Sequence, residues 1–200
     1  MAELYFTKNG YDWDGGFFEL AIEIGPPSDD KLYSVLHTVW QHPTLEGCYL
    51  EPNLEPSAQE RKAPSKSDIG SSKRLLGLAT MPNGKRIACG TILMREDNGS
   101  DWLDFFLPLG SLSEAYAVGA YPFGDIESAR IWQHPIEAWL ASVAVYVFQL
   151  ASFQLGLIGF EALGESHAKI LAKDGIPPKR LYTYLWPDHG QLQHFPQNVP

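Results

Sequence analysis

One hairpin signal constrains the fold of this chain more than any other feature. The pair Asn83-Gly84 stands between two apolar runs, at residues 74–81 and 86–95. Asn-Gly accepts the backbone angles of a tight turn, so the two runs are predicted to pair as antiparallel strands. A second turn leads to another strand-like run at 102–107. The sequence therefore predicts a three-stranded antiparallel meander.

The remaining elements follow from periodicity and from turn residues. Residues 17–24 alternate between apolar and polar side chains, which predicts a half-buried strand. Leu32, Val35, Leu36 and Val39 recur at helical spacing, which predicts a helix that begins near Ser28 and ends near Gln41. The other predictions are strands at 4–7, 155–163 and 181–186, a possible short strand at 48–50, a long helix at 135–153, a short helix at 166–173, and a C-terminal tail lying against the surface.

The stretch from 101 to 124 is predicted to lie where the sheet meets the long helix. Pro108 and Gly110 should end the preceding strand, because proline cannot donate to a sheet ladder. The chain is then expected to turn through residues 111–116. Pro135 suits the first position of the long helix, whose apolar residues surround it on nearly all sides. We therefore expect this helix to be buried on most sides.

These elements predict one α+β domain over residues 1–200, with a mostly antiparallel mixed sheet packed on the long buried central helix. The predicted order is β-β-α-β-β-β-α-β-α-β. Residues 51–72 hold three prolines, mixed charge and few apolar side chains, which predicts a long exposed loop.

Composition restricts the classes of partner and the compartment. A net charge of −9 argues against a nucleic-acid-binding protein, whose affinity would depend on clustered Lys and Arg. Residues 139–160 carry no charge, but polar residues interrupt the run and no basic cluster flanks it, so a buried helix and strand are expected rather than a membrane span. Two cysteines and an N-terminus without a signal-peptide pattern indicate a cytoplasmic protein.

Motifs for phosphate loops, dinucleotide binding, zinc proteolysis and serine esterases are absent from the sequence. Glu161 and His167 lie where a strand is predicted to turn into a short helix, and with Tyr121 they are the candidate catalytic residues. Two further groupings hold acidic or histidine side chains. Asp101, Asp104 and Glu127 form a possible carboxylate cluster, although the first two should point to opposite faces of a strand. Asp188, His189 and His194 are spaced loosely enough to bind a metal, but they lie in a terminal tail, so we predict no metal site there.

Aromatic residues beside a glycine form a second kind of candidate site. Such a composition suits a ligand pocket or a partner surface, and packed loop residues are the alternative. The candidate residues for this surface are Tyr116, Gly119, Tyr121, Phe123 and Trp132. Trp132 also opens the second copy of a repeated Trp-Gln-His-Pro, whose first copy begins at Trp40; we interpret the repeat as chance.

The predicted order of elements from the meander onward is similar to that of GNAT-type acyltransferases. In that family a loop of the form [RQ]-x-x-G-x-[GA] binds coenzyme A, and the nearest match here places Tyr116, Gly119 and Tyr121 at its three positions, of which only the glycine agrees. The resemblance implies an acyl-coenzyme A dependent N-acyltransferase, with coenzyme A as its cofactor.

The competing hypothesis is a non-catalytic protein- or ligand-binding domain of the inhibitor, immunity or adaptor type, with no cofactor. Acidic charge, many aromatic residues and the absence of catalytic motifs favour it, and an acidic surface steers toward basic partners. A deep pocket that holds Glu161 or Glu23 beside Tyr121 or Tyr184 would instead favour an enzyme.

Overall fold

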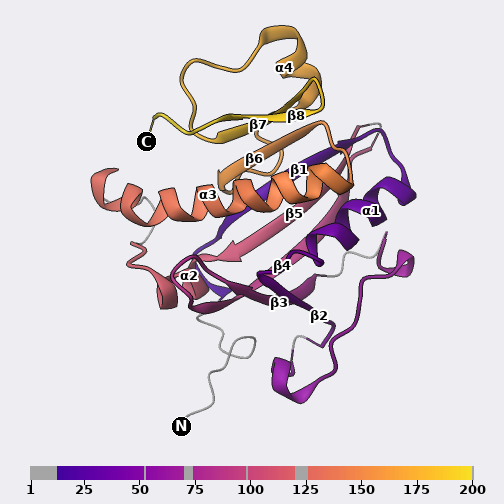
Figure 1. Ribbon diagram of the computed structural model, residues 1–200, viewed down its shortest axis with the longest axis vertical. Coiled ribbons are helices and arrows are strands. Elements are labelled where there is room, and N and C mark those ends of the chain that lie inside the picture. Colours follow the sequence, from indigo (N-terminus) through magenta and orange to yellow (C-terminus); the bar gives the residue numbers. More distant parts are fainter. Residues whose placement is uncertain (1–12, 52, 70–73, 98, 120–125, 200) are drawn as a thin grey trace.

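An eight-stranded sheet forms the centre of the protein, with strand order β2-β3-β4-β5-β1-β6-β7-β8 (Figure 1). The computed structural model describes residues 13–51, 53–69, 74–97, 99–119 and 126–199. The strands are β1 (Phe17–Gly25), β2 (Leu45–Tyr49), β3 (Leu75–Thr80), β4 (Arg86–Arg95), β5 (Asp101–Pro108), β6 (Leu155–Phe160), β7 (Thr183–Asp188) and β8 (Gln191–Phe195). The helices are α1 (Asp29–Val39), α2 (Leu109–Ala115), α3 (Ile126–Leu150) and α4 (Ala168–Asp174).

The predicted meander is confirmed as β3, β4 and β5, which pair in sequence order with antiparallel registers. The β3–β4 turn uses three residues, Pro82 to Gly84, and is closed by a hydrogen bond from the Met81 N–H to the Lys85 carbonyl. Of these residues only Gly84 has a positive φ, of 82°. Proline at the first turn position holds φ near −65°, which selects a type I turn followed by a left-handed glycine.

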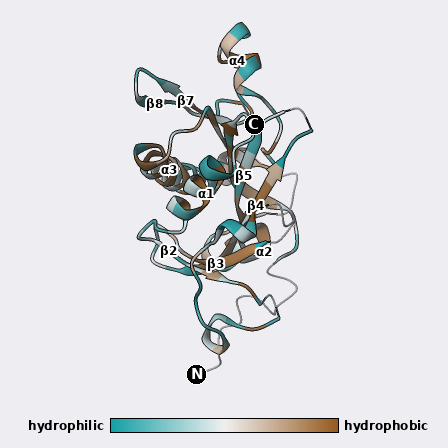
Figure 2. Ribbon diagram, turned by 90° about the vertical axis from the view of Figure 1, so that its right-hand side faces the viewer, coloured by the Kyte–Doolittle hydropathy of each residue, from teal (hydrophilic) through white to brown (hydrophobic). Residues whose placement is uncertain are grey.

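The two faces of β1 serve different parts of the molecule, because β1 lies between β5 and β6 in the middle of the sheet. Phe18, Leu20, Ile22 and Ile24 point to the face that α1 and α3 cover, which we call the helix face (Figure 2). Glu19, Ala21 and Glu23 point to the opposite face, which we call the second face. These glutamates are also buried. The prediction of a half-buried strand is therefore wrong, since chain segments cover both faces.

The long helix differs from its prediction in two ways. It begins at Ile126, so that Pro135 lies inside the helix rather than at its first position. Proline has no N–H, so the carbonyl of the residue four positions earlier, Ile131, lacks its helical donor. Ile131 is 79% exposed, so water can reach this carbonyl. Burial on most sides is not confirmed, because Ile131, Val145 and Leu150 are exposed. Among the helices that the structure describes, none is long and apolar enough to cross a membrane.

Other corrections concern the order and the pairing of elements. Residues 109–115 form α2 in place of the predicted turn, because Leu109 and Leu112 both reach the core at helical spacing. The predicted tail instead holds strand β8. The sheet is antiparallel throughout rather than mixed. The strand predicted at 4–7 lies outside the described residues.

A charged clamp joins the end of the meander to the start of α1. Arg95 donates to both oxygens of Asp101, at 2.6 and 2.9 Å, and to Asp29 at 2.8 Å. The Ser28 N–H also donates to Asp101, at 2.8 Å. The Asp101 side chain is 0% exposed while that of Arg95 is 44% exposed. Hydrogen bonds from Arg95 and Ser28 lower the Asp101 pKa against the opposing effect of burial.

Replacing Arg95 with methionine should lower the free energy of unfolding by about 1–3 kcal/mol at pH 7, because a buried carboxylate loses two charged donors. Water around the half-exposed Arg95 limits this cost. A lowered carboxyl pKa stabilises the fold above the ordinary value, so the cost should shrink as the pH falls below about 3.9. Urea denaturation of the wild type and the variant at pH 7, and again below about pH 3.9, measures this cost. Arg86→Met is the control, since its pair with Glu46 is exposed on both sides and should contribute about 0–1 kcal/mol.

Candidate functional site

Two glutamates of β1 fix the chain that follows β6 onto the second face of the sheet. Glu19 Oε1 accepts the Leu163 N–H at 2.6 Å. Glu23 Oε2 accepts the Ala168 N–H at 2.6 Å, at the first residue of α4, and Glu23 Oε1 accepts the Ser100 hydroxyl at 2.6 Å. Hydrogen bonds to charged groups are among the stronger ones, so these carboxylates hold α4 and its preceding loop in place.

Glu19 also forms a buried carboxyl pair with Asp104 of β5. The two side chains are 2% and 3% exposed and hydrogen-bond to one another. Burial raises the Glu19 pKa to about 7 and raises that of Asp104 well above its ordinary value. The Leu163 N–H favours ionised Glu19, so Asp104 holds the proton and donates it to Glu19. Asp104 Oδ1 is buried and has no hydrogen-bond partner among the described residues.

Aromatic rings and an arginine lie next to this pair on the same face. Phe106 is directly opposite Glu19 in the β1–β5 register, and its ring occupies the space where a Cβ at Gly90 would stand. The Phe17 ring lies 4.8 Å from the Phe106 ring, centroid to centroid. Arg74, which precedes β3, places its Cζ 5.5 Å from the Phe17 centroid and 5.8 Å from the Phe106 centroid. A guanidinium at such distances is attracted by the faces of both rings.

Glu161 completes the cluster, which we call the acidic site and which consists of Phe17, Glu19, Arg74, Asp104, Phe106 and Glu161. Glu161 is exposed, and its Oε1 accepts the Phe17 N–H at 3.0 Å. Its charge raises the pKa of both buried carboxyl groups, whereas the charge of Arg74 lowers that of Asp104. The acidic site therefore combines negative charge with an aromatic surface, which is the chemistry that binds organic cations.

Only one predicted catalytic residue belongs to this site. Glu161 is part of it, whereas His167 occupies the N-cap position of α4 without a side-chain capping hydrogen bond, and its ring packs edge-on against Trp102 with the ring centroids 5.6 Å apart. Tyr121 lies outside the described residues. Asp101 and Asp104 of the possible carboxylate cluster do not pair with one another. Asp101 instead binds Arg95, and Asp104 binds Glu19. The Glu127 side chain is not among those described.

The predicted aromatic surface is not brought together by the described residues. Trp132 is buried and packs edge-on against Phe18 with the ring centroids 5.3 Å apart, so it belongs to the core. Tyr116 follows α2 and its hydroxyl is buried without a partner among the described residues, while Gly119 is exposed. Phe123 lies outside the described residues. Over the part of the chain that is described, no group of three His, Cys, Asp or Glu residues could hold a metal ion.

Sequence reasoning missed Glu19 and Arg74. The alternating pattern assigns Glu19 to the exposed side of a half-buried strand, and Arg74 is notable there only as the first residue of the run predicted to form the first strand of the meander. One signal was available, because Glu19, Glu23 and Asp104 each stand inside an apolar strand run, where a charge needs a partner.

No protein-family model, curated protein or solved structure matches this chain.

Proposed function

We propose that this protein is a non-catalytic binding domain of the inhibitor, immunity or adaptor type, which acts in the cytoplasm on a basic protein partner. In this proposal the acidic site binds a cationic side chain of that partner. The observation that carries the proposal is the position of Arg74, whose guanidinium lies over Phe17 and Phe106. The site thus already holds a cation from its own chain.

The carboxyl groups support binding more than catalysis. Glu19 is engaged by the Leu163 N–H and by Asp104, and Glu161 by the Phe17 N–H, so these groups serve structural contacts. The unpartnered Asp104 Oδ1 is a buried acceptor that a donor could satisfy. The net charge of −9 would increase the rate of encounter with a basic partner.

The experiment uses a defined cation, N-acetyl-arginine amide, and its neutral isostere N-acetyl-citrulline amide. Arg74→Ala should bind the arginine compound several-fold more tightly than the wild type does, because an occupied site reduces apparent affinity by the fraction that is free. The citrulline compound should bind neither protein measurably. Titration followed by NMR chemical shifts measures both affinities.

Two further variants locate the binding. Adding Glu161→Gln to Arg74→Ala should weaken the arginine compound, since glutamine retains the oxygen that accepts the Phe17 N–H but lacks the charge. Arg86→Ala, on the other hand, removes an arginine outside the site and should change nothing. Equal affinity for the arginine and citrulline compounds, or no effect of Arg74→Ala, would refute the proposed site.

A thermal unfolding scan with acetyl-coenzyme A tests the acyltransferase alternative. A ligand at a hundredfold its dissociation constant stabilises the native state by about 2.7 kcal/mol. We expect no shift in the melting temperature. A clear upward shift would contradict a non-catalytic role and direct attention to the loop that contains Gly119.

A further inference from the structure

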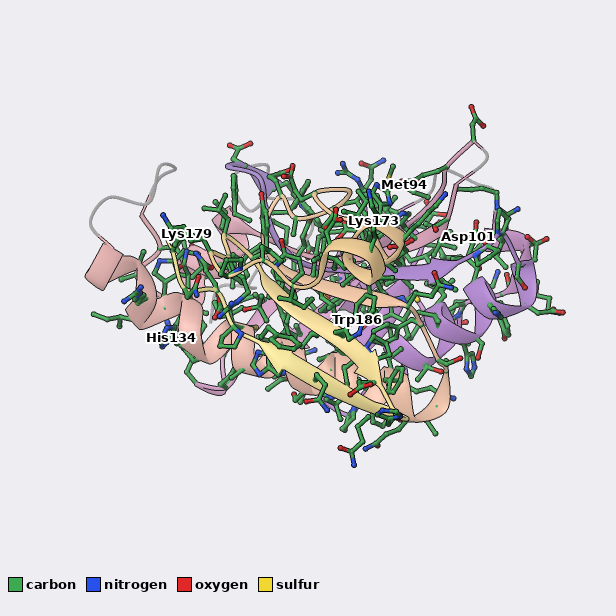
Figure 3. The ribbon with its side chains drawn as sticks, turned by 90° about the horizontal axis from the view of Figure 1, so that it is seen from above. Met94, Asp101, His134, Lys173, Lys179 and Trp186 are labelled. Carbon is green, nitrogen blue, oxygen red and sulfur yellow. The ribbon has the colours of Figure 1, made fainter. Side chains whose placement is uncertain are left out.

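The two edge strands of the sheet, β2 and β8, differ in whether another segment of the chain hydrogen-bonds to them. At the β2 edge, Cys48 and Lys62 exchange backbone hydrogen bonds of 3.0 and 2.9 Å, so the following loop covers the end of β2. At the other edge β8 has β7 as its one neighbour. Among the described residues, none outside β7 forms a backbone hydrogen bond with β8. Figure 3 looks onto this end of the molecule, where β7 with Trp186, β8 and α4 lie nearest to the viewer.

The hairpin geometry identifies which backbone groups of β8 are unpaired. His189 and Gly190 form a two-residue turn with φ of 47° and 77°, and Asp188 pairs with Gln191 across it. Residue pairs in an antiparallel ladder alternate between hydrogen-bonded and non-hydrogen-bonded, and the pair that closes a two-residue turn is hydrogen-bonded. The N–H and C=O groups of Leu192 and His194 therefore point away from β7, toward the open edge.

This edge lacks the features that usually prevent strands from pairing. Exposed edges are normally protected by charged side chains, by proline or by a bulge. Residues 189–199 contain no Asp, Glu, Lys or Arg, and the first proline is Pro196, just beyond β8.

We propose that β8 pairs with β8 of a second copy of this chain, antiparallel across a two-fold axis, so that one sheet runs through both copies. With the axis at Gln193, Leu192 stands opposite His194 of the second copy, and each such pair exchanges two hydrogen bonds. A two-fold contact is self-complementary by construction. Because residues 189–199 carry no carboxylate, no like charges face one another where the two acidic molecules meet, whereas the basic partner proposed above would gain nothing from an uncharged edge. This inference does not depend on the acidic site.

Sedimentation velocity across micromolar to millimolar concentrations should show a dimer of the wild-type protein. His194→Pro removes two intermolecular hydrogen bonds, one in each copy, and should weaken the dimer by about 10- to 100-fold. The β7–β8 pairing should survive, because the lost N–H points outward. His194→Thr keeps that N–H and should remain dimeric. A wild-type monomer throughout, or equal dimers of the proline and threonine variants, would overturn the proposal.

A charge exchange at Gln193 tests the register without proline. Gln193→Lys and Gln193→Glu each place like charges face to face across the axis, so each variant alone should be less dimeric than the wild type. Mixing the two should restore dimers, because opposite charges then meet. The exposed Gln149 of α3 offers a matched control, since the same pair of changes there should leave dimerisation unaltered. Failure of the mixture to recover would rule out this pairing.

Discussion

Replacing Trp40 with alanine should lower the free energy of unfolding by about 3–5 kcal/mol, the usual cost of deleting a buried tryptophan ring. The ring lies just after α1, in the core of the helix face. Its Nε1 donates to Thr91 Oγ1 of β4 at 3.1 Å, so truncation also leaves a buried hydroxyl without its donor. Urea denaturation monitored by circular dichroism measures the loss. A cost below about 1 kcal/mol would contradict this account of the packing.

The same ring explains two glycines in neighbouring strands. A Cβ on Gly77 would stand 2.2 Å from Trp40 Cζ3, and one on Gly47 would stand 2.4 Å from the same atom. Both glycines therefore form the flat surface on which the ring lies. Gly77→Ala should cost about 1–3 kcal/mol through overpacking, and less when Trp40 is already alanine. Gly119→Ala is the matched control, because a Cβ there would meet nothing within 4 Å.

Local patterns predicted the parts of the fold that local forces determine. The Asn83-Gly84 signal and the apolar runs around it predicted the meander, because a hairpin depends on a few adjacent residues. The helical spacing from Leu32 to Val39 predicted α1 for the same reason, and Ser28 caps it through the Lys31 N–H as expected.

Errors arose where tertiary packing overrides a local signal. Pro135 was interpreted as the start of a helix, although proline is tolerated inside one where its freed carbonyl faces solvent. The strand does end at Pro108 as expected, but residues 111–116 are predicted as a turn, whereas Leu109 and Leu112 bring α2 onto the core. The His189-Gly190 turn was overlooked, and β8 was missed with it.

The acidic site was beyond local prediction because it depends on strand order. Glu19 and Asp104 meet because β1 inserts between β5 and β6, and no short-range pattern indicates that pairing. Arg74 reaches the site because it directly precedes β3, whose first residue, Leu75, pairs with Thr91 of β4 beside the part of β5 that carries Phe106. Sequence reasoning did identify Glu161 as notable, but as a catalytic residue rather than as the exposed member of the acidic site.

The buried carboxyl pair should make the protein less stable at pH 8 than near pH 5. Glu19 has a pKa raised to about 7, and burial raises that of Asp104 well above its ordinary value, so the folded state binds more protons than the unfolded state across this range. Stability then falls as the pH rises from the unfolded values near 4 through the folded ones. Asp104→Asn keeps an N–H donor for Glu19 but removes the titratable carboxyl group of Asp104. It should be more stable than the wild type at pH 8 by about 1–3 kcal/mol and similar to it at pH 5.

Urea denaturation of both proteins between pH 5 and pH 8 measures the two slopes. The variant should retain part of the slope, because burial also raises the pKa of Glu137 in α3 to about 7, and that group titrates with the same sign. Glu137→Gln separates this contribution and should leave the effect of Asp104→Asn unchanged. The lowered pKa of Asp101 acts only at more acidic pH. Burial lowers the pKa of His42 and that of His194, and these groups titrate with the opposite sign in this range, so the comparison between the two proteins is decisive. If Asp104→Asn has the wild-type slope, then the pair does not share a proton in the folded protein.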